Sequence, residues 1–525
     1  MQKHFFSTAS VIALLVAGPA LANDSFVDQI GVGNTANVNQ TAGEEGDSVI
    51  TQDGSGNLAE VTQDEDPNGS AVFGTPTNDA DISQLGDNSR ARITQFNPGG
   101  GTGVTNEAWI DQDSSNIETV PSGYALNARI VQAGEGNVSG IKQRGNAPAP
   151  FEGSGLTARN EQTGDFNTSS IEQRDDNATP HSDVDVVQTG NGNDSTVLQR
   201  GPNEDVDVVQ TGDNNSSDVE QGGRRDLTTM VTQNGDDNIS SVSQKGRRNT
   251  ATVAQSDNGQ NSTVTQDMDS EDATVNVMQS NGPNTSTVTQ TAALNGSLVT
   301  VDQSGIGETS TVNQGGDAQN VNVAQSGSGN SSTVDQAGAN GDVDIMQSGT
   351  GGNNSVNQGG TQQIAMLDQS GTGNSNNVVQ SGDNSLADVT QSGGSSNSLI
   401  TQSGSTLSAI VDQSGTGGSS DINQSGIGQT AMLTQGGTGN QNFMIQSGSG
   451  NWASVTQSGS NSISTILQSD DNHQATVFQQ MAGNTSTITQ MGTGAGNIAD
   501  VSQLTGGNNS TVSQNGQNNT ATVVQ

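Results

Sequence analysis

Apolar and polar residues alternate along most of this chain in short blocks that end on glutamine. Near the end of the chain, Ser510, Val512 and Gln514 occupy every second position, and an identical spacing returns eleven residues later, closing on Gln525. A period of two places alternate side chains on opposite faces of a β-strand. Glycine, asparagine and serine separate the blocks and are typical of turns. The pattern therefore predicts strands of about five to seven residues joined by short turns.

The glutamine spacing is regular over a long part of the chain. Between Gln303 and Gln490 lie seventeen consecutive intervals of eleven residues, with glutamine at every step. The residue four places before each glutamine is valine, alanine or threonine in one block and serine or asparagine in the next. This alternation indicates that the repeating unit contains two blocks and is 22 residues long.

Insertions support the same unit. From Gln132 onward, every lengthened interval follows a block of the serine type, as between Gln143 and Gln162 or between Gln490 and Gln503. A three-sided helix would scatter insertions by threes, whereas a unit of strand, turn, strand and turn confines them to one of two turns. We therefore predict an all-β fold, a two-sided parallel β-solenoid of the cross-β type with about 22 residues per rung.

Four alternate positions of each block are predicted to point inwards: asparagine or glycine, then a small or branched residue, then valine or isoleucine, then glutamine. Rungs stacked at about 4.8 Å would place each glutamine on the glutamine two strands along. A buried amide without a partner costs about 1 to 3 kcal/mol, but amides in a row can bond to one another. The predicted glutamine ladder comprises Gln303, Gln314, Gln325, Gln336, Gln347, Gln358, Gln369, Gln380, Gln391, Gln402, Gln413, Gln424, Gln435, Gln446, Gln457, Gln468, Gln479 and Gln490. The predicted core ladder comprises Val288, Val301, Val312, Val323, Val334, Ile345, Val455, Val512 and Val523.

Composition changes this interpretation only in part. The chain has 525 residues, 28% of them hydrophobic, and a net charge of -41, which alone would favour disorder. The periodic pattern argues instead for a repeat fold, and the acidity is expected to keep the chain soluble before it assembles. No lysine or arginine follows Arg248, so nucleic acid is not an expected partner. The absence of cysteine means that no disulfide holds the fold.

The chain divides into three predicted parts. Residues 1–22 resemble a secretion signal peptide, with Lys3, the apolar run from Val11 to Ala17 and a small-residue cleavage site ending at Ala22. That run is too short for a membrane span, and no later stretch is long and apolar enough to be one. Residues 23–131 are expected to be irregular repeats with inserted loops, and residues 132–525 a regular solenoid of the same kind.

Candidate chemistry is sparse. The three histidines, His4, His181 and His473, are scattered, so no catalytic site and no cofactor site are predicted. Aspartate pairs such as Asp175-Asp176 and Asp470-Asp471 are interpreted as solvated charge rather than as metal ligands, because the calcium-binding nonapeptide does not recur. The expectation is a protein that is not an enzyme.

The ends of the repeat array are expected to matter. A terminal rung exposes unpaired backbone groups and half of a ladder, and repeat proteins that stay soluble usually cover it with a polar cap. The first block here follows the predicted cleavage site, and the last one stops at Gln525. We therefore expect Val523 and Gln525 to form an assembly edge through which chains stack end to end.

Tandem segments such as residues 325–336 and 446–457 carry the spacing Gln-x-Gly-x-Gly-Asn followed by a second glutamine, which resembles the curlin motif. The resemblance covers nearly all of residues 23–525. It implies a curlin-like fold and a subunit of curli-like fibres: a functional amyloid, secreted and extracellular at the bacterial surface, that serves adhesion and biofilm matrix. The implied partners are further copies of the chain, other curlin-like subunits and an outer-membrane secretion pore.

Two other functions are compatible with a solenoid. Outward threonine pairs, such as Thr263 with Thr265 and Thr287 with Thr289, resemble the flat threonine rows of ice-binding surfaces. A monomeric extracellular adhesin would instead need a groove of clustered aromatic or carboxylate residues. Trp109 and Trp452 lie far apart in the chain, so the sequence gives no sign of such a groove.

Overall fold

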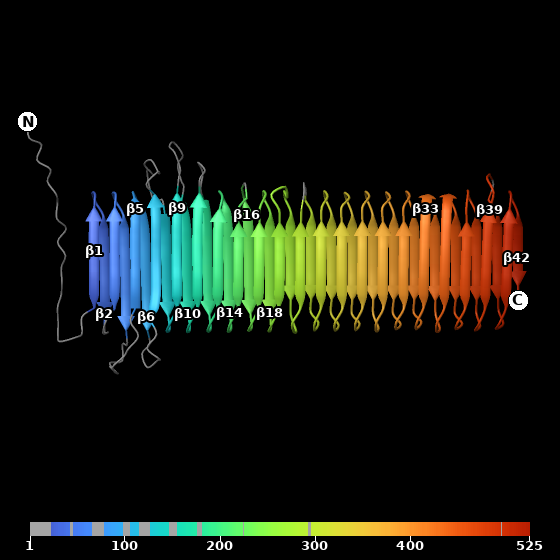
Figure 1. The fold of residues 1–525 in the computed structure, drawn as a ribbon, viewed down its shortest axis with the longest axis horizontal. Helices are drawn as coiled ribbons and strands as arrows, with labels where there is room; N and C mark the ends of the chain where they lie inside the picture. Colours follow the sequence, from blue (N-terminus) through green and yellow to red (C-terminus); the bar gives the residue numbers. More distant parts are fainter. Residues whose placement is uncertain are drawn as a thin grey trace, which may run out of the picture.

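The structure is a computed structural model that describes residues 23–41, 46–65, 78–97, 105–114, 126–145, 155–175, 181–223, 225–291, 296–494 and 496–525. The predicted signal peptide, residues 1–22, lies outside the described residues. Figure 1 shows the strands side by side along one long axis, with β1 and β42 at opposite ends. The all-β solenoid predicted from the repeat pattern is confirmed.

Odd-numbered strands form one parallel sheet, called the odd sheet. Its strands are β1 (Asp24–Ile30), β3 (Asp47–Asp53), β5 (Asn78–Gly86), β7 (Asn106–Ser114), β9 (Val138–Gly145), β11 (Thr168–Asp175), β13 (Asp194–Arg200), β15 (Ser216–Gln221), β17 (Ile239–Gln244), β19 (Asn261–Gln266), β21 (Thr285–Gln290), β23 (Thr309–Gln314), β25 (Ser331–Gln336), β27 (Asn353–Gln358), β29 (Ser375–Gln380), β31 (Asn397–Gln402), β33 (Ser419–Ile427), β35 (Gln441–Ser449), β37 (Ile463–Gln468), β39 (Thr485–Met491) and β41 (Asn509–Asn515).

Even-numbered strands form the second parallel sheet, called the even sheet. Its strands are β2 (Thr35–Thr41), β4 (Leu58–Glu65), β6 (Ser89–Asn97), β8 (Leu126–Ala133), β10 (Gly155–Thr163), β12 (His181–Thr189), β14 (Glu204–Thr211), β16 (Leu227–Asn234), β18 (Thr250–Ser256), β20 (Thr274–Gln279), β22 (Leu298–Gln303), β24 (Asn320–Gln325), β26 (Asp342–Gln347), β28 (Ile364–Gln369), β30 (Leu386–Gln391), β32 (Ser408–Gln413), β34 (Thr430–Gln435), β36 (Trp452–Gln457), β38 (Gln474–Gln479), β40 (Ile498–Gln503) and β42 (Thr520–Val524).

Each strand pairs in parallel with the strand two places along the chain. In the regular part the partners are 22 residues apart, so Val301 pairs with Val323 and Gln303 with Gln325. One odd strand, the following even strand and their two turns make one rung. Because partners in the register are equivalent residues, each inward position forms a row of like side chains along the axis.

The core is one continuous apolar cluster that draws on both sheets, from Ile50 near the start to Val512 near the end. In most rungs the odd sheet contributes a small polar residue beside its branched apolar residue, as at Ser286 and Val288, whereas the even sheet contributes a second apolar residue, as at Val299 and Val301. All four of these side chains are buried. Blocks of the serine type in the sequence therefore form the odd sheet, and blocks of the valine or alanine type form the even sheet.

Connections differ between the two edges of the solenoid. From β9 onward, the long connections run from an odd to an even strand, as from β9 to β10 and from β39 to β40. Before β8, long connections also run the other way, from β4 to β5 and from β6 to β7. Strand pairing continues across residue 131, where β6 pairs with β8 and β8 with β10. The connections on the two sides of residue 131 differ in length, but the sheets run through it. The division into residues 23–131 and 132–525 stays a prediction.

Glycine is required where neighbouring turns approach each other. Gly54 has a φ of +134°, and a Cβ at this position would overlap the carbonyl oxygen of Gly86 in the next turn. Gly31 stands in the same relation to Gly54, with a φ of +117°. At Gly31 and Gly54 the turns can therefore stack at the strand spacing because these two residues have no side chain.

Candidate functional site: the amide ladders and the outer rungs

The inward glutamines of the odd sheet form an unbroken hydrogen-bonded row. The Nε2 of each glutamine donates to the Oε1 of the glutamine in the next odd strand, from Gln29 in β1 to Gln514 in β41. The Nε2 to Oε1 distance is 2.8 Å between Gln336 and Gln358 and again between Gln358 and Gln380. Away from the outer rungs these side chains are buried.

The even sheet carries a second row of the same kind. It runs from Gln40 in β2 to Gln525, the residue after β42, again with each Nε2 donating to the next Oε1. The structure thus divides the predicted glutamines between two rows. The odd row holds Gln314, Gln336, Gln358, Gln380, Gln402, Gln424, Gln446, Gln468 and Gln490, and the even row holds Gln303, Gln325, Gln347, Gln369, Gln391, Gln413, Gln435, Gln457 and Gln479.

Most amides also join the two sheets. The second N–H of Gln303 in β22 donates to the backbone oxygen of Thr285 in β21, at 3.0 Å. Gln468 in β37 bonds the backbone oxygen of Trp452 in β36 in the same way, at 3.0 Å. A glutamine in this position uses both of its N–H groups and its oxygen, so its burial carries no unpaired group.

The predicted core residues lie in the rows between the sheets. Val288, Val312, Val334 and Val512 belong to the odd sheet, and Val301, Val323, Ile345, Val455 and Val523 to the even sheet. All are fully buried except at the outer rung, where Val512 is 6% exposed and Val523 is only partly buried. Packing therefore weakens at the last rung.

A second set of polar rows consists of side chains in the turns that accept from the backbone N–H of the next turn. The sequence pattern did not predict these hydrogen bonds. The side-chain Oδ1 of Asn215 accepts from the backbone N–H of Asn238 at 3.1 Å, and Asn238 Oδ1 accepts from the N–H of Gln260 at 2.9 Å. The turns at the other edge do the same, because Asn451 Oδ1 accepts from the N–H of His473 at 2.8 Å. The sequence signal is an asparagine six residues before the glutamine of the following strand, as in Asn451 and Gln457.

His473 and Glu308 are ionisable residues at positions of these turn rows. His473 is buried, its Nδ1 accepts from the N–H of Asn497 at 3.1 Å, and its Nε2 lies 2.7 Å from the backbone oxygen of Ser469. Glu308 is also buried and accepts from the N–H of Asn330 at 2.9 Å. Burial raises the pKa of Glu308 above its ordinary value, against the lowering effect of the bonds from Asn330. Both residues are structural members of a row.

Carboxylates stack in the first rungs of the odd sheet. Asp47, Asp79 and Glu107 are register partners in β3, β5 and β7. Burial raises the pKa of Asp79, and the neighbouring carboxylates of Asp81, Asp47 and Glu107 raise it further. In-register stacking therefore concentrates negative charge near the N-terminal rungs.

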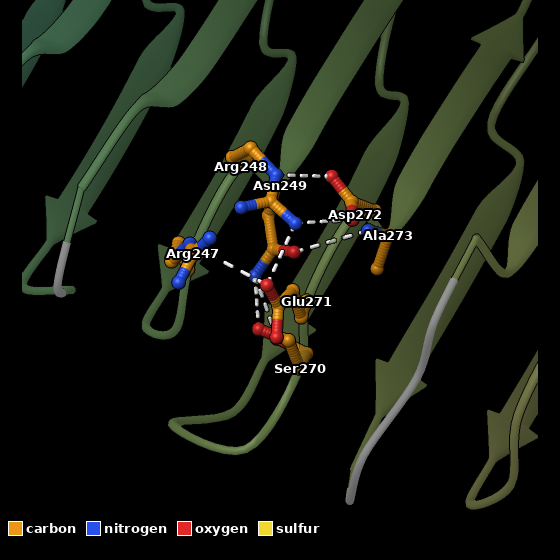
Figure 2. A network of polar contacts seen from close by, with 7 residues as sticks. All are labelled: Arg247, Arg248, Asn249, Ser270, Glu271, Asp272 and Ala273. Atoms are coloured by element: carbon orange, nitrogen blue, oxygen red, sulfur yellow. Dashed lines mark hydrogen bonds and ion pairs between the residues drawn. The ribbon is translucent and has the colours of Figure 1, made fainter.

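Several arginines of this acidic chain join neighbouring rungs. Figure 2 shows Arg248, in the turn after β17, reaching the next turn of the same edge, which follows β19. Its Nε donates to Asp272 at 2.6 Å and its Nη2 to Glu271 at 2.6 Å. These contacts raise the pKa of Arg248 and lower that of Asp272. Beside them, Asn249 Oδ1 accepts from the N–H of Ala273 at 3.1 Å, which is one step of a turn row.

Among the residues that the structure describes, no group of three or more histidine, cysteine, aspartate or glutamate side chains could hold a metal ion. Within the same ranges there is no helix of the length and hydropathy needed to cross a membrane. The described arrangement is a scaffold of backbone and amide rows.

The two outer rungs are half-paired within the chain. β1 pairs with β3 and β2 with β4, while β41 pairs with β39 and β42 with β40. Inward side chains of β1 and β2, such as Val27 and Val38, are only partly buried, whereas the equivalent Ile50 and Val61 of the next rung are buried. Edges of this kind offer backbone and side-chain bonds to a further strand.

A family model described as the curlin associated repeat matches the chain at residues 225–256 and 382–415. The first match covers β16 to β18 and the second β30 to β32, so each spans about one and a half rungs. None of the curated proteins compared with the chain matches it in sequence.

Proposed function

Because the chain is a curlin-repeat protein with a β-solenoid fold, we propose that it is the structural subunit of curli-like extracellular amyloid fibres. In this proposal, subunits assemble by end-to-end stacking of rungs, and the fibres serve cell adhesion and biofilm matrix. The fold and the repeat fit a structural protein rather than an enzyme.

The observation that carries the proposal is the cross-β arrangement within a single chain. Parallel in-register strands with unbroken amide rows are the bonding pattern of amyloid, in which every backbone group pairs with the strands above and below. Here that pattern continues to rungs whose strands have one partner each. A further copy that added a rung would bond to the exposed edge as each internal rung bonds to its neighbour.

Export is part of the proposal. Residues 1–22 would direct secretion and be removed, an outer-membrane pore would release the chain, and other curlin-like subunits would share the fibre. These partners follow from the family alone, and their test is cellular: replacing residues 11–17 with a charged segment should keep the protein inside the cell. Fibres at the surface of cells that carry this change would contradict the predicted signal.

Assembly is tested on the protein that begins at Asn23, incubated at neutral pH. We expect electron microscopy to show unbranched fibres, and fibre diffraction to show a reflection at about 4.7 to 4.8 Å along the fibre axis. Only monomers after prolonged incubation would overturn the proposal. A strain without the gene should then lose surface adhesion and matrix, and restoring the gene should restore both.

The ice-binding alternative rests on the outward threonines. Thr263 and Thr265 in β19 are register partners of Thr287 and Thr289 in β21, so a flat threonine patch exists on the odd sheet. The next rung replaces one threonine by Asn313, and the patch is therefore narrow along the axis. Thermal hysteresis of the monomeric protein would favour this function over fibre formation.

A further inference from the structure

Four arginines gather on the outer face of the even sheet. Arg92 in β6, Arg129 in β8 and Arg159 in β10 are register partners. Neighbouring strands lie about 4.8 Å apart, so these three form a row of like charges along the axis, called here the arginine row. Arg90 precedes Arg92 by two residues and shares its face. Like charges directly opposite each other destabilise a sheet, so the arginine row calls for anionic groups beside it.

The arginine row borders a pocket of about 200 Å³. Arg90 also lines this pocket, together with Asn127 of β8 and Thr157 of β10, which are register partners of each other. The pocket therefore presents guanidinium N–H groups beside an amide and a hydroxyl, and none of the described residues that line it is acidic. Such a set of groups fits a ligand that carries both an anionic group and hydroxyls.

Carboxylates of the chain leave the middle of the arginine row underpaired. The register partners of its two ends are Glu60 in β4 and Asp185 in β12. Arg129, in the middle, has one described ion pair, to Glu161 at 3.4 Å, and Glu161 also pairs with Arg159. The side chain of Arg129 is 46% exposed. Because a guanidinium group has five N–H donors, Arg129 keeps donors for an anion from outside the chain.

The neighbourhood of the arginine row favours an anionic sugar as that ligand. Guanidinium groups recognise carboxylate and phosphate alike, so the charge alone does not choose between them. Phe96 lies on the same face of β6 and is 37% exposed, which offers one aromatic surface for one sugar ring. A single-stranded nucleic acid needs a series of aromatic side chains for successive bases, and Phe96 is the one aromatic residue in β6, β8 and β10.

We infer that the arginine row binds the carboxylate groups of an acidic polysaccharide, a polymer of uronic acids. Successive carboxylates of an extended polymer would meet Arg92, Arg129 and Arg159, while Asn127 and Thr157 bond sugar hydroxyls. The net charge of -41 repels any polyanion, but salt at 0.15 M screens exposed charges beyond about 8 Å, so the local row governs binding. This function goes beyond the proposed fibre and does not depend on assembly.

Two substitutions separate the arginine row from the general charge of the chain. Arg129→Gln removes the central guanidinium group and keeps a long polar side chain on the outward face. The matched control is Arg144→Gln, which removes the same charge from an exposed position of β9 in the odd sheet. Arg129→Lys keeps the charge but loses the planar fork that holds a carboxylate with two bonds. Circular dichroism checks that all three variants stay folded.

The experiment measures binding of end-labelled oligogalacturonate to dilute monomeric protein that begins at Asn23, by fluorescence anisotropy at 0.15 M salt. We expect the unchanged protein and Arg144→Gln to bind with the same Kd, and Arg129→Gln to bind at least about tenfold more weakly. Arg129→Lys should lie between them. The same oligosaccharide with methyl-esterified carboxyl groups should not bind, because its sugar rings are unchanged but its charges are gone.

Three results would overturn the inference. The first is no binding of oligogalacturonate to the unchanged protein. The second is an equal loss of affinity in Arg129→Gln and Arg144→Gln, which would mean that the arginine row is not the site. The third is tighter binding of a single-stranded oligonucleotide of the same charge, which would make the ligand a nucleic acid. Because the assay uses monomers, each of these results leaves the proposed fibre function standing, and a failure to form fibres leaves the arginine row testable.

Discussion

Replacing one internal ladder glutamine by leucine should test whether the amide rows stabilise the fold. Gln358 in β27 accepts from Gln336 Nε2 and donates to Gln380 Oε1, both at 2.8 Å, and its side chain is 1% exposed. Gln358→Leu removes both bonds and leaves two buried amide groups without these partners. The matched control is Asn357→Leu, which makes the same kind of change at the neighbouring exposed position of the strand.

The magnitude follows from the two groups left behind. Each buried group without its partner costs about 1 to 3 kcal/mol, so the loss is about 2 to 6 kcal/mol. Burying a leucine side chain returns about 1.5 to 3 kcal/mol. We expect Gln358→Leu to lower the free energy of unfolding by about 2 kcal/mol, and Asn357→Leu to change it by less than about 0.5 kcal/mol.

The assay is chemical denaturation of dilute monomeric protein followed by circular dichroism, with hydrogen exchange measured peptide by peptide. Because each rung of a solenoid contacts only its neighbours, the loss of protection should centre on β25, β27 and β29. Equal stability of the two variants, or a loss of protection spread evenly along the chain, would refute the reasoning that the amide row sets local stability.

Three further predictions concern single positions. Val288→Asp places an unpaired charge in the buried core and should abolish folding of the surrounding rungs, whereas Thr289→Asp, on the outward face, should be mild; circular dichroism and limited proteolysis distinguish them. Ser286→Ala removes a buried hydroxyl that has no described partner and should leave the free energy of unfolding unchanged or raise it by up to about 1 kcal/mol. Glu308→Gln should stabilise the protein at neutral pH, because the buried carboxyl has a raised pKa and its contribution to stability is lost as the pH rises through that pKa. The difference between Glu308→Gln and the unchanged protein should vanish as the pH falls below the ordinary value of 4.5, which urea denaturation at a series of pH values would measure.

The sequence defines the turn rows less completely than the glutamine rows. The glutamines repeat at a fixed interval that any register must respect, so their stacking can be predicted from spacing alone. The turn positions vary among asparagine, glutamine and serine, with single cases such as Glu308 and His473, and glycine at some turns interrupts the rows. What the polar residues share is a side-chain oxygen or nitrogen that accepts from the backbone N–H of the next turn, and this relation appears only when the turns are stacked.

By itself the sequence determined the strand period, the 22-residue unit, the two-sided rung and which residues face inwards, because each of these is a local pattern repeated many times. That unit already assigns Gln303 and Gln314 to different rows, and in the structure these rows lie in opposite sheets. The tertiary structure decided the direction of those rows. A glutamine has a donor and an acceptor on one amide group, and its identity in the sequence does not say which of them faces which neighbour. Only the packed side chains, bonded on one side to the next rung and on another to the facing sheet, fix that choice.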